Sequence, residues 1–146
     1  MRLPLGRFAL VGLAAAALGA VLAWPRINDV ETGKTPEYPD LPPKEYGASV
    51  EKVTKAVKAA VSSLPRWRLV GEGKGAAGAE IQVVCTSLLW LEHDVTIRVR
   101  RENGRTRVSV SSKSRTGAWD FGQNARNIRE LLRALDREAL LKEMDE

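Results

Sequence analysis

The chain has 146 residues, a net charge of +5 and a hydrophobic fraction of 44%. Once an apolar run near the N-terminus is set aside, this length leaves room for one modest domain. So weak a positive charge does not by itself indicate nucleic-acid binding. The single cysteine, Cys85, excludes an internal disulfide, and there is no CxxC, HExxH or glycine-rich nucleotide loop. We therefore expect no metal site, no other cofactor and no nucleic-acid partner.

The first element predicted is a membrane-spanning helix, because residues 8–24 carry no charge and follow Arg2 and Arg7. About 17 residues with a rise of about 1.5 Å each span roughly 25 Å, the short end of what a bilayer core needs. A signal peptide cleaved after Val21-Leu22-Ala23 is the alternative. We favour an uncleaved single-pass anchor over residues 1–24 of a protein of the cytoplasmic membrane, with the N-terminus in the cytoplasm and the rest periplasmic. The anchor residues are Phe8, Leu13, Leu18 and the interfacial Trp24.

A proline-rich segment follows over residues 25–47 and holds five of the seven prolines. Proline favours extended backbone, so a plain tether is one interpretation. The apolar residues Tyr38, Leu41 and Tyr46 favour another, because a spacer does not need them. We expect a short tether followed by an arm docked on the domain.

Residues 48–146 are expected to form a single α+β domain. Ser49 can cap a helix that Pro65 ends, and apolar residues at steps of three and four predict a last helix from Phe121 to about Leu141. Strands are predicted at residues 66–70, 80–91, 93–101 and 106–111, with a flexible glycine-rich surface loop at 71–78 and a hairpin turn at Asn103-Gly104. This order predicts a four-stranded antiparallel sheet with both helices on one face, the face bearing Val95, Ile97 and Val99.

The second predicted strand ends in the apolar residues Leu88-Leu89-Trp90-Leu91. They either close the core or form an exposed apolar tip that faces a membrane or a partner. We expect them in the core. Cys85, on the same strand face as Ile81 and Val83, is expected to be buried as well.

The most distinctive stretch, Ser112–Asn124, lies between the last strand and the last helix. Gly117 and Gly122 give the backbone freedom to reverse. Asp120 followed by Gln123 has the spacing of a capping box.

Arg115 and Asn124 are expected to face the same turn as Asp120. One interpretation is a rigid corner, in which the three side chains satisfy backbone groups. The alternative is a polar pocket, in which Arg115 and the helix N-terminus hold an anion.

The pattern S-x-S-R-x-G-x-x-D-x-G-x-N, preceded by a strand with Asp94-Val95, resembles the bacterial and plastid family named domain of unknown function 1499. Residues 28–32 and Tyr38-Pro39 resemble the N-terminal segment of that family. The family tends to have a carboxylate at the position of His93 and an Arg at that of Asn127. It has no established activity, so the resemblance implies a fold and a setting. The motif residues it implies are Asp94, Ser114, Arg115, Gly117, Asp120, Gly122 and Asn124.

Basic residues concentrate on the last hairpin and its exit, against the single acid Glu102. On an open sheet face they could bind anionic lipid, an envelope polymer or an acidic protein, or they could serve only solubility. Nucleic acid is disfavoured because no aromatic residues interleave them. The binding residues expected are Arg98, Arg100, Arg107 and Arg115.

No catalytic residue is expected, because His93 is the only histidine and Asp94 points to the opposite strand face. We expect a membrane-anchored, extracytoplasmic, non-enzymatic binding domain that contacts membrane lipid. It would be an accessory subunit or stabilising partner of a membrane protein complex. The alternative is an anionic ligand- or lipid-binding protein, or a small hydrolase, with a pocket formed by Asp94, Arg115 and Asp120.

Overall fold

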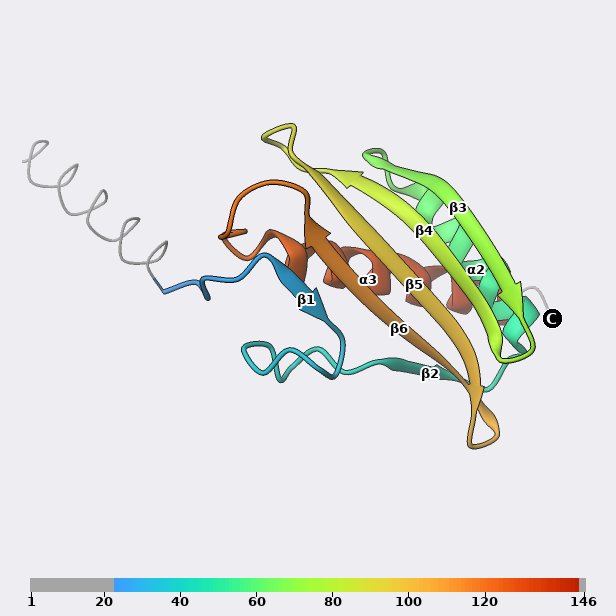
Figure 1. The fold of residues 1–146 in the computed structure, drawn as a ribbon. Helices are drawn as coiled ribbons and strands as arrows, with labels where there is room; N and C mark the ends of the chain where they lie inside the picture. Colours follow the sequence, from blue (N-terminus) through green and yellow to red (C-terminus); the bar gives the residue numbers. More distant parts are fainter. Residues whose placement is uncertain (1–22, 145–146) are drawn as a thin grey trace, which may run out of the picture.

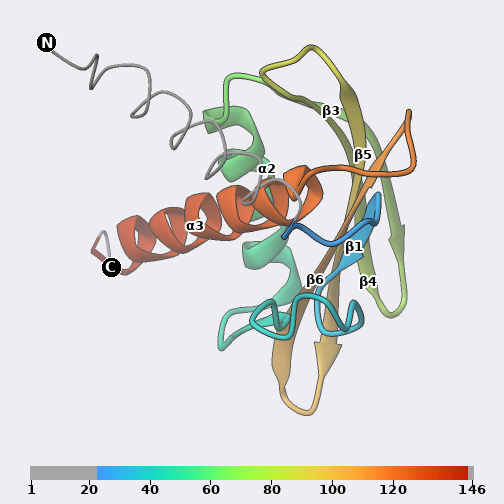
Figure 2. The same ribbon diagram turned by 90° about the vertical axis from the view of Figure 1, so that its left-hand side faces the viewer.

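A computed structural model describes residues 23–144, which form two layers: a six-stranded antiparallel sheet and two helices on one of its faces (Figures 1 and 2). The strand order is β1-β6-β5-β4-β3, and β2 pairs with β6 as well. The α+β class and the placement of both helices on one face are confirmed, but the sheet has six strands instead of four. The elements are β1 (Asp29–Glu31), β2 (Lys44–Tyr46), α2 (Val50–Ser63), β3 (Trp67–Gly75), β4 (Gly78–Thr86), β5 (Glu92–Glu102), β6 (Arg105–Ser114) and α3 (Gln123–Met144).

The core lies between the helices and the inward face of the sheet. The Ser49 side chain caps α2 by accepting from the Lys52 backbone N–H at 3.2 Å, and α2 ends just before Pro65. The predicted inward face of β5 is confirmed, because its three apolar side chains are at most 1% exposed. Burial of one such side chain contributes about 1.5–3 kcal/mol relative to its exposure. The side chains at the centre of this layer are Val57, Ala60, Val95, Ile97, Val99, Ile128, Leu131 and Leu135.

The proline-rich segment docks on the sheet through two short strands. β1 and β2 both pair antiparallel with β6, and Val30 and Leu41 are buried in the core. The Thr32 hydroxyl accepts from the Val110 backbone N–H at 3.0 Å between the two strands. These contacts cover the β6 edge of the sheet.

The predicted glycine-rich loop at residues 71–78 is wrong. β3 continues to Gly75, and only Ala76 and Ala77 form the turn into β4. A bulge between Leu69 and Gly71 shifts the register of the β3–β4 pair. Glycine weakens a strand only modestly, and the hydrogen bonds to β4 outweigh this effect here.

The prediction that Leu88–Leu91 closes the core is also wrong. Leu88 and Leu89 are each 79% exposed and Trp90 is 84% exposed. The Ser87 backbone N–H donates to the Leu91 carbonyl, and the Trp90 N–H donates to the Ser87 carbonyl, so the chain reverses in a tight loop. The run of apolar residues suggests burial, but the tight turn between Ser87 and Leu91 directs these side chains into solvent. Cys85 is buried as predicted, and burial raises the pKa of its thiol to about 12.

The predicted anchor residues Phe8, Leu13 and Leu18 lie outside the described residues. Trp24 is described, and its ring packs edge-on against the ring of Phe121 at 6.3 Å between centroids. Within residues 23–144, no helix is both long and apolar enough to cross a bilayer.

Candidate functional site

The corner between β6 and α3 is built around the carboxylate of Asp120. Its Oδ1 atom accepts from the Gly122 N–H at 2.8 Å, and Oδ2 accepts from the Asn124 N–H at 3.2 Å. Gly117 and Gly122 have φ of 79° and 76°, which glycine adopts at little cost. The carboxylate therefore occupies the positive end of the α3 dipole, where an external anion would otherwise bind.

Asn124 connects this corner to the buried end of β6. Its Nδ2 atom lies 2.8 Å from Asp120 Oδ2, 2.9 Å from Ser114 Oγ and 2.8 Å from the Asn28 carbonyl. Its Oδ1 atom accepts from the Ser112 hydroxyl at 2.7 Å. Asn124 and Ser112 are fully buried, and Ser114 and Asp120 are nearly so. One amide thus joins two strands, the corner and the helix.

Asn127, one turn further along α3, extends the same network. Its Nδ2 atom donates to Ser112 Oγ at 3.2 Å, and its Oδ1 atom accepts from the Gln123 side chain at 2.8 Å. The predicted capping box is therefore wrong in its second half, because the Gln123 amide binds Asn127 instead of returning to Asp120. Gln123 is partly buried beside the network and reaches forward along the helix.

The docked arm closes the network from the side of β1. The Asp120 N–H donates to the Ile27 carbonyl at 2.8 Å, and the Ser114 N–H donates to the Asn28 carbonyl at 2.9 Å. The Asn28 side chain donates to the Gly117 carbonyl at 2.6 Å. The corner is thus hydrogen-bonded to the docked arm as well as to the helix.

His93 on β5 completes the network, and it is only 2% exposed. Its Nδ1 atom lies 3.1 Å from Ser114 Oγ and 3.2 Å from Asn124 Oδ1, so it is hydrogen-bonded in either tautomer. Its Nε2 atom is buried and has no partner among the described residues. Burial lowers the pKa of His93, although Asn124 and Asp120 act in the opposite direction.

This pKa shift predicts acid sensitivity of the fold. The folded pKa lies below the unfolded value of about 6.5, so the unfolded chain binds more protons as the pH falls below about 6.5. Stability should be complete above that pH and decline below it, by at most about 1.4 kcal/mol per pH unit for one proton. We expect a melting temperature lower at pH 5 than at pH 7.5, with a smaller difference in His93→Gln. An equal difference in both proteins would assign the acid effect to other groups.

Arg115 lies on the other face of the sheet, contrary to the prediction that it faces the turn with Asp120 and Asn124. Its guanidinium pairs with Asp94, at 2.9 Å from Nη2 to Oδ1, and with Glu92. The hydrogen bond to Asp94 raises the pKa of Arg115. Ser114 points inward and Arg115 outward because successive strand residues point to opposite faces.

The alternative pocket of Asp94, Arg115 and Asp120 is therefore not assembled. The Asp94 and Arg115 side chains are 57% and 41% exposed on the open face, whereas Asp120 is 7% exposed under the helix layer. Within residues 23–144, no three His, Cys, Asp or Glu side chains converge as a metal site.

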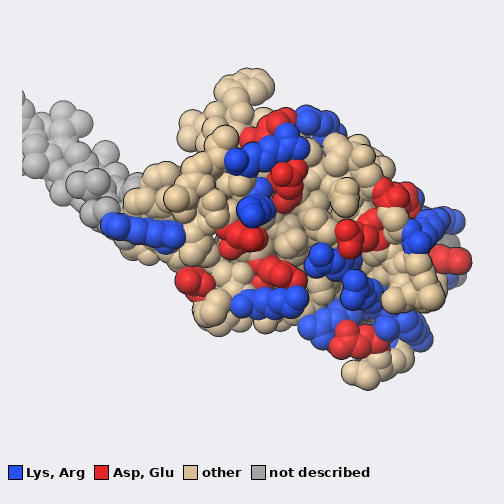
Figure 3. Space-filling model, in the orientation of Figure 1, with Lys and Arg blue, Asp and Glu red and all other residues tan. Residues whose placement is uncertain are grey.

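The other arginines of the open face are partly compensated by neighbouring acids, and basic and acidic side chains are interspersed on this face (Figure 3). Arg98 pairs with Glu80 at 3.2 Å and with Glu31 at 3.7 Å. Arg107 pairs with Glu102 at 3.3 Å. Among the described residues, Arg100 and Lys113 on this face form no salt bridge. Arg101 forms none either, but it lies on the helix side of the sheet. Of the four predicted binding residues, Arg100 is thus the one with its charge uncompensated.

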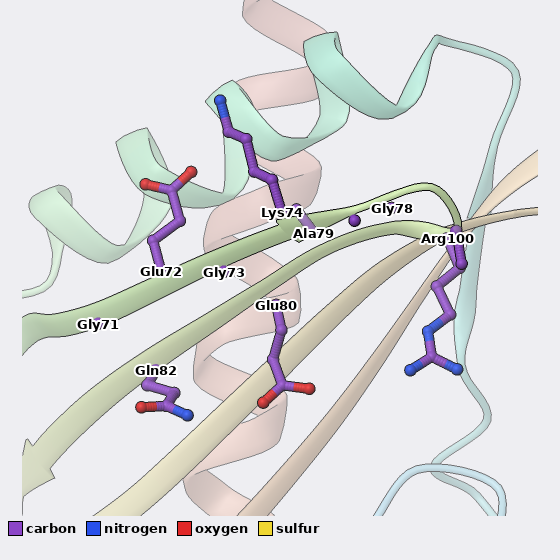
Figure 4. Close-up of a pocket in the computed structure, with 11 residues that line it drawn as sticks. Gly71, Glu72, Gly73, Lys74, Gly78, Ala79, Glu80, Gln82 and Arg100 are labelled. Carbon is purple, nitrogen blue, oxygen red and sulfur yellow. The ribbon is translucent and has the colours of Figure 1, made fainter.

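Arg100 lines two shallow hollows of the open face. The first, of about 570 Å³, follows the ends of β3 and β4. In Figure 4 the side chains of Glu72 and Lys74 point toward the helix layer, whereas Glu80 and Arg100 project to the opposite side. The second hollow, of about 660 Å³, is lined by Arg98, Arg100 and Arg107 and also by Glu31, Glu80 and Glu102. Arg100 therefore lies between a concave, glycine-floored surface and a hollow of mixed charge.

Sequence reasoning missed the roles of Ser112, His93 and Asn127. A signal was available in β6, where inward positions run from Val108 and Val110 to Ser112 and Ser114. Polar residues at inward strand positions need buried partners, so they indicate a polar network at that end of the core. Their hydrogen-bond partners on α3, Asn124 and Asn127, could be identified only from the structure.

A family model described as "Protein of unknown function (DUF1499)" matches residues 22–135 of the chain. The match covers the arm, the sheet, the corner and most of α3. No curated protein and no solved structure matches.

Proposed function

The chain belongs to the DUF1499 family, and we propose from its own geometry that it is a membrane-tethered, non-enzymatic binding domain. It would act as an accessory subunit that contacts a protein of the same membrane with the basic end of its open sheet face. The tether is the apolar segment of residues 8–24, and the domain lies outside the cytoplasmic membrane.

A non-enzymatic role is supported by the burial of the side chains that could do chemistry. His93, Ser112 and Ser114 are 2%, 0% and 8% exposed; His93 is bonded to Ser114, and all three are bonded to Asn124. A nucleophile and its base must reach a substrate. These groups instead lie inside the core, where a substrate cannot reach them.

The observation that carries the binding role is the charge of Arg100 on the open face, which forms no salt bridge among the described residues. Arg100 is exposed near the end of β5, and Arg107, its cross-strand partner on β6, lines the same hollow. Arg100 lies between the two hollows, which gives a partner both charge and shape to recognise. An acidic side chain of a partner could pair with Arg100 without first breaking an ion pair.

The position of this basic end favours a protein partner over lipid. The described chain begins at residue 23 at one end of the sheet, and the β5–β6 hairpin lies at the other end (Figure 1). A tether at the first end holds the hairpin away from the membrane surface. The attraction of anionic lipid falls off within about a Debye length, about 8 Å in physiological salt.

Reversal of the charges of Arg100 and Arg107 tests the proposal. We expect Arg100→Glu/Arg107→Glu to lose its copurifying membrane protein in mild detergent, because each new carboxylate would face an acidic partner. A loss of about 100-fold in affinity corresponds to about 2.7 kcal/mol, within the several kcal/mol that like charges cost at an interface. Binding by the unchanged chain should weaken with added salt.

The matched control is Lys55→Glu/Arg133→Glu, which changes the net charge equally but lies on the exposed side of the helix layer. It should retain the partner. Equal retention by both variants, or no copurifying protein with the unchanged chain, would refute the proposal.

A further inference from the structure

We infer that the end of the domain at which the tether enters lies in the interfacial layer of the membrane, held there by two exposed aromatic sites. This inference rests on the proposed tether and names lipid as the partner of that end. One site is the apolar tip, Leu88–Leu91, and the other is the aromatic cluster, Trp24, Trp119 and Phe121. Both sites lie at the end of the molecule where the described chain begins (Figures 1 and 2).

The apolar tip is held by its loop in a conformation that exposes its side chains to solvent. Ser87 closes the loop through its backbone bonds and through its Oγ atom, which accepts from the Leu91 N–H at 3.3 Å. Trp90 has φ of 63°, a left-handed conformation that is rare for a bulky residue. The loop thus contains a strained backbone residue and leaves Leu88, Leu89 and Trp90 about four-fifths exposed.

The aromatic cluster shows the same combination. Phe121 has φ of 52° and is 42% exposed. Its ring stacks on Trp119 at 4.4 Å and meets the edge of Trp24. Within residues 23–144, the non-glycine residues with left-handed φ are Trp90, Phe121 and the hairpin residue Asn103. Two of these three strained positions therefore expose an aromatic ring at the tether end.

Arginines accompany both sites, as expected of a surface at the level of lipid headgroups. The guanidinium carbon of Arg26 lies 5.1 Å from the ring centre of Trp119, and that of Arg126 lies 5.4 Å from that of Trp24. Arg66 and Arg68 line a hollow with Trp90. Tryptophan is enriched at the membrane interface, and a nearby arginine can extend its charged head to the level of the headgroup phosphates.

Lipid is the occupant that the rest of the chain indicates. Residues 8–22 are uncharged and lead directly into Trp24, so a bilayer that holds them also places the cluster at its surface. A protein partner of the tip would have to compete with that adjacent bilayer. The basic hairpin, at the opposite end, stays free for the protein proposed above.

The test uses the full chain in nanodiscs of phosphatidylcholine and phosphatidylglycerol, without any partner. Spin labels are placed one at a time by Leu88→Cys, Leu89→Cys and the control Ala76→Cys, which lies in the exposed β3–β4 turn. Leu13→Cys reports the tether, and unsubstituted protein measures any label on the buried Cys85. Collisions with oxygen report lipid, and collisions with a water-soluble nickel complex report solvent.

We expect labels at 88 and 89 to favour oxygen over nickel, and the label at 76 to favour nickel. Water-like ratios at 88 and 89 with a lipid-like label at 13 would overturn this inference and leave the tethered function standing. Shielding of 88 and 89 from both probes would also overturn it, since that result indicates a protein contact. A water-like label at 13 would refute the tether and with it both proposals.

Discussion

Replacement of Asn124 by alanine is expected to lower the free energy of unfolding by about 3–4 kcal/mol. The amide is fully buried and joins Asp120, Ser112, Ser114 and the Asn28 carbonyl. Its removal leaves several of these groups without a partner, and an unsatisfied buried polar group costs about 1–3 kcal/mol. Urea denaturation of the full chain in detergent, followed by tryptophan fluorescence, measures the change.

The control for this prediction is Ser109→Ala on the open face of β6, where the serine lines a solvent-exposed hollow. A surface change of this kind should alter stability by less than about 0.5 kcal/mol. If Asn124→Ala were as mild as the control, the buried network would not be what holds the corner together.

Gly78→Ala is expected to cost about 2–4 kcal/mol, because the added methyl group has no room. Gly78 has φ of 144°, and a Cβ atom there would lie 1.9 Å from the Val99 carbonyl oxygen. That oxygen belongs to the neighbouring strand, so relief of the clash would require β4 and β5 to separate at their ends. Thermal unfolding of the variant measures the loss.

Gly75→Ala is the matched control, since Gly75 is the partner of Gly78 across the same hairpin and its Cβ would meet nothing within 4 Å. Its effect on stability should be small, because the added methyl group meets no other atom and alanine also reduces the conformational entropy of the unfolded chain. Equal losses in the two variants would contradict the close approach of Gly78 to Val99.

The regular elements could be predicted from the sequence, because each is long enough to show a period. The helix from Ser49 to Pro65, the alternation of Val95 and Ile97 and the turn at Asn103 all follow from local chemistry. β1 and β2 could not be predicted, since three residues in a proline-rich segment show no alternation. They become strands only because the β6 edge offers hydrogen-bond partners.

The candidate site could be predicted in part. The role of Asp120 at the helix start follows from its spacing, but Arg115 was placed on the wrong face because the strand was not followed through Ser114. Glu31 and Glu80 could not be recognised as partners of Arg98, since that pairing depends on register across the sheet. A charged residue with no opposite charge near it in the sequence can thus form an ion pair in the folded protein.

The two positions at which the chain differs from the family pattern, His93 and Asn127, lie in the same part of the structure. His93 and Asn127 both belong to the buried network, and Asn124 and Ser112 connect them. The chain therefore has two neutral side chains where the resemblance implies a carboxylate and an arginine. Neutral groups avoid the cost of burying charge, so the two positions are consistent with each other.

The proposed function requires that the open sheet face, rather than the helix layer, binds a membrane protein. Photo-crosslinking in native membranes is the direct test, with the reactive side chain placed at Ser109 on the open face or at Lys55 on α2. We expect one discrete adduct from position 109, lost in Arg100→Glu/Arg107→Glu, and none from position 55. An adduct from position 55 alone, equal adducts from both positions, or none from 109 would contradict the claim.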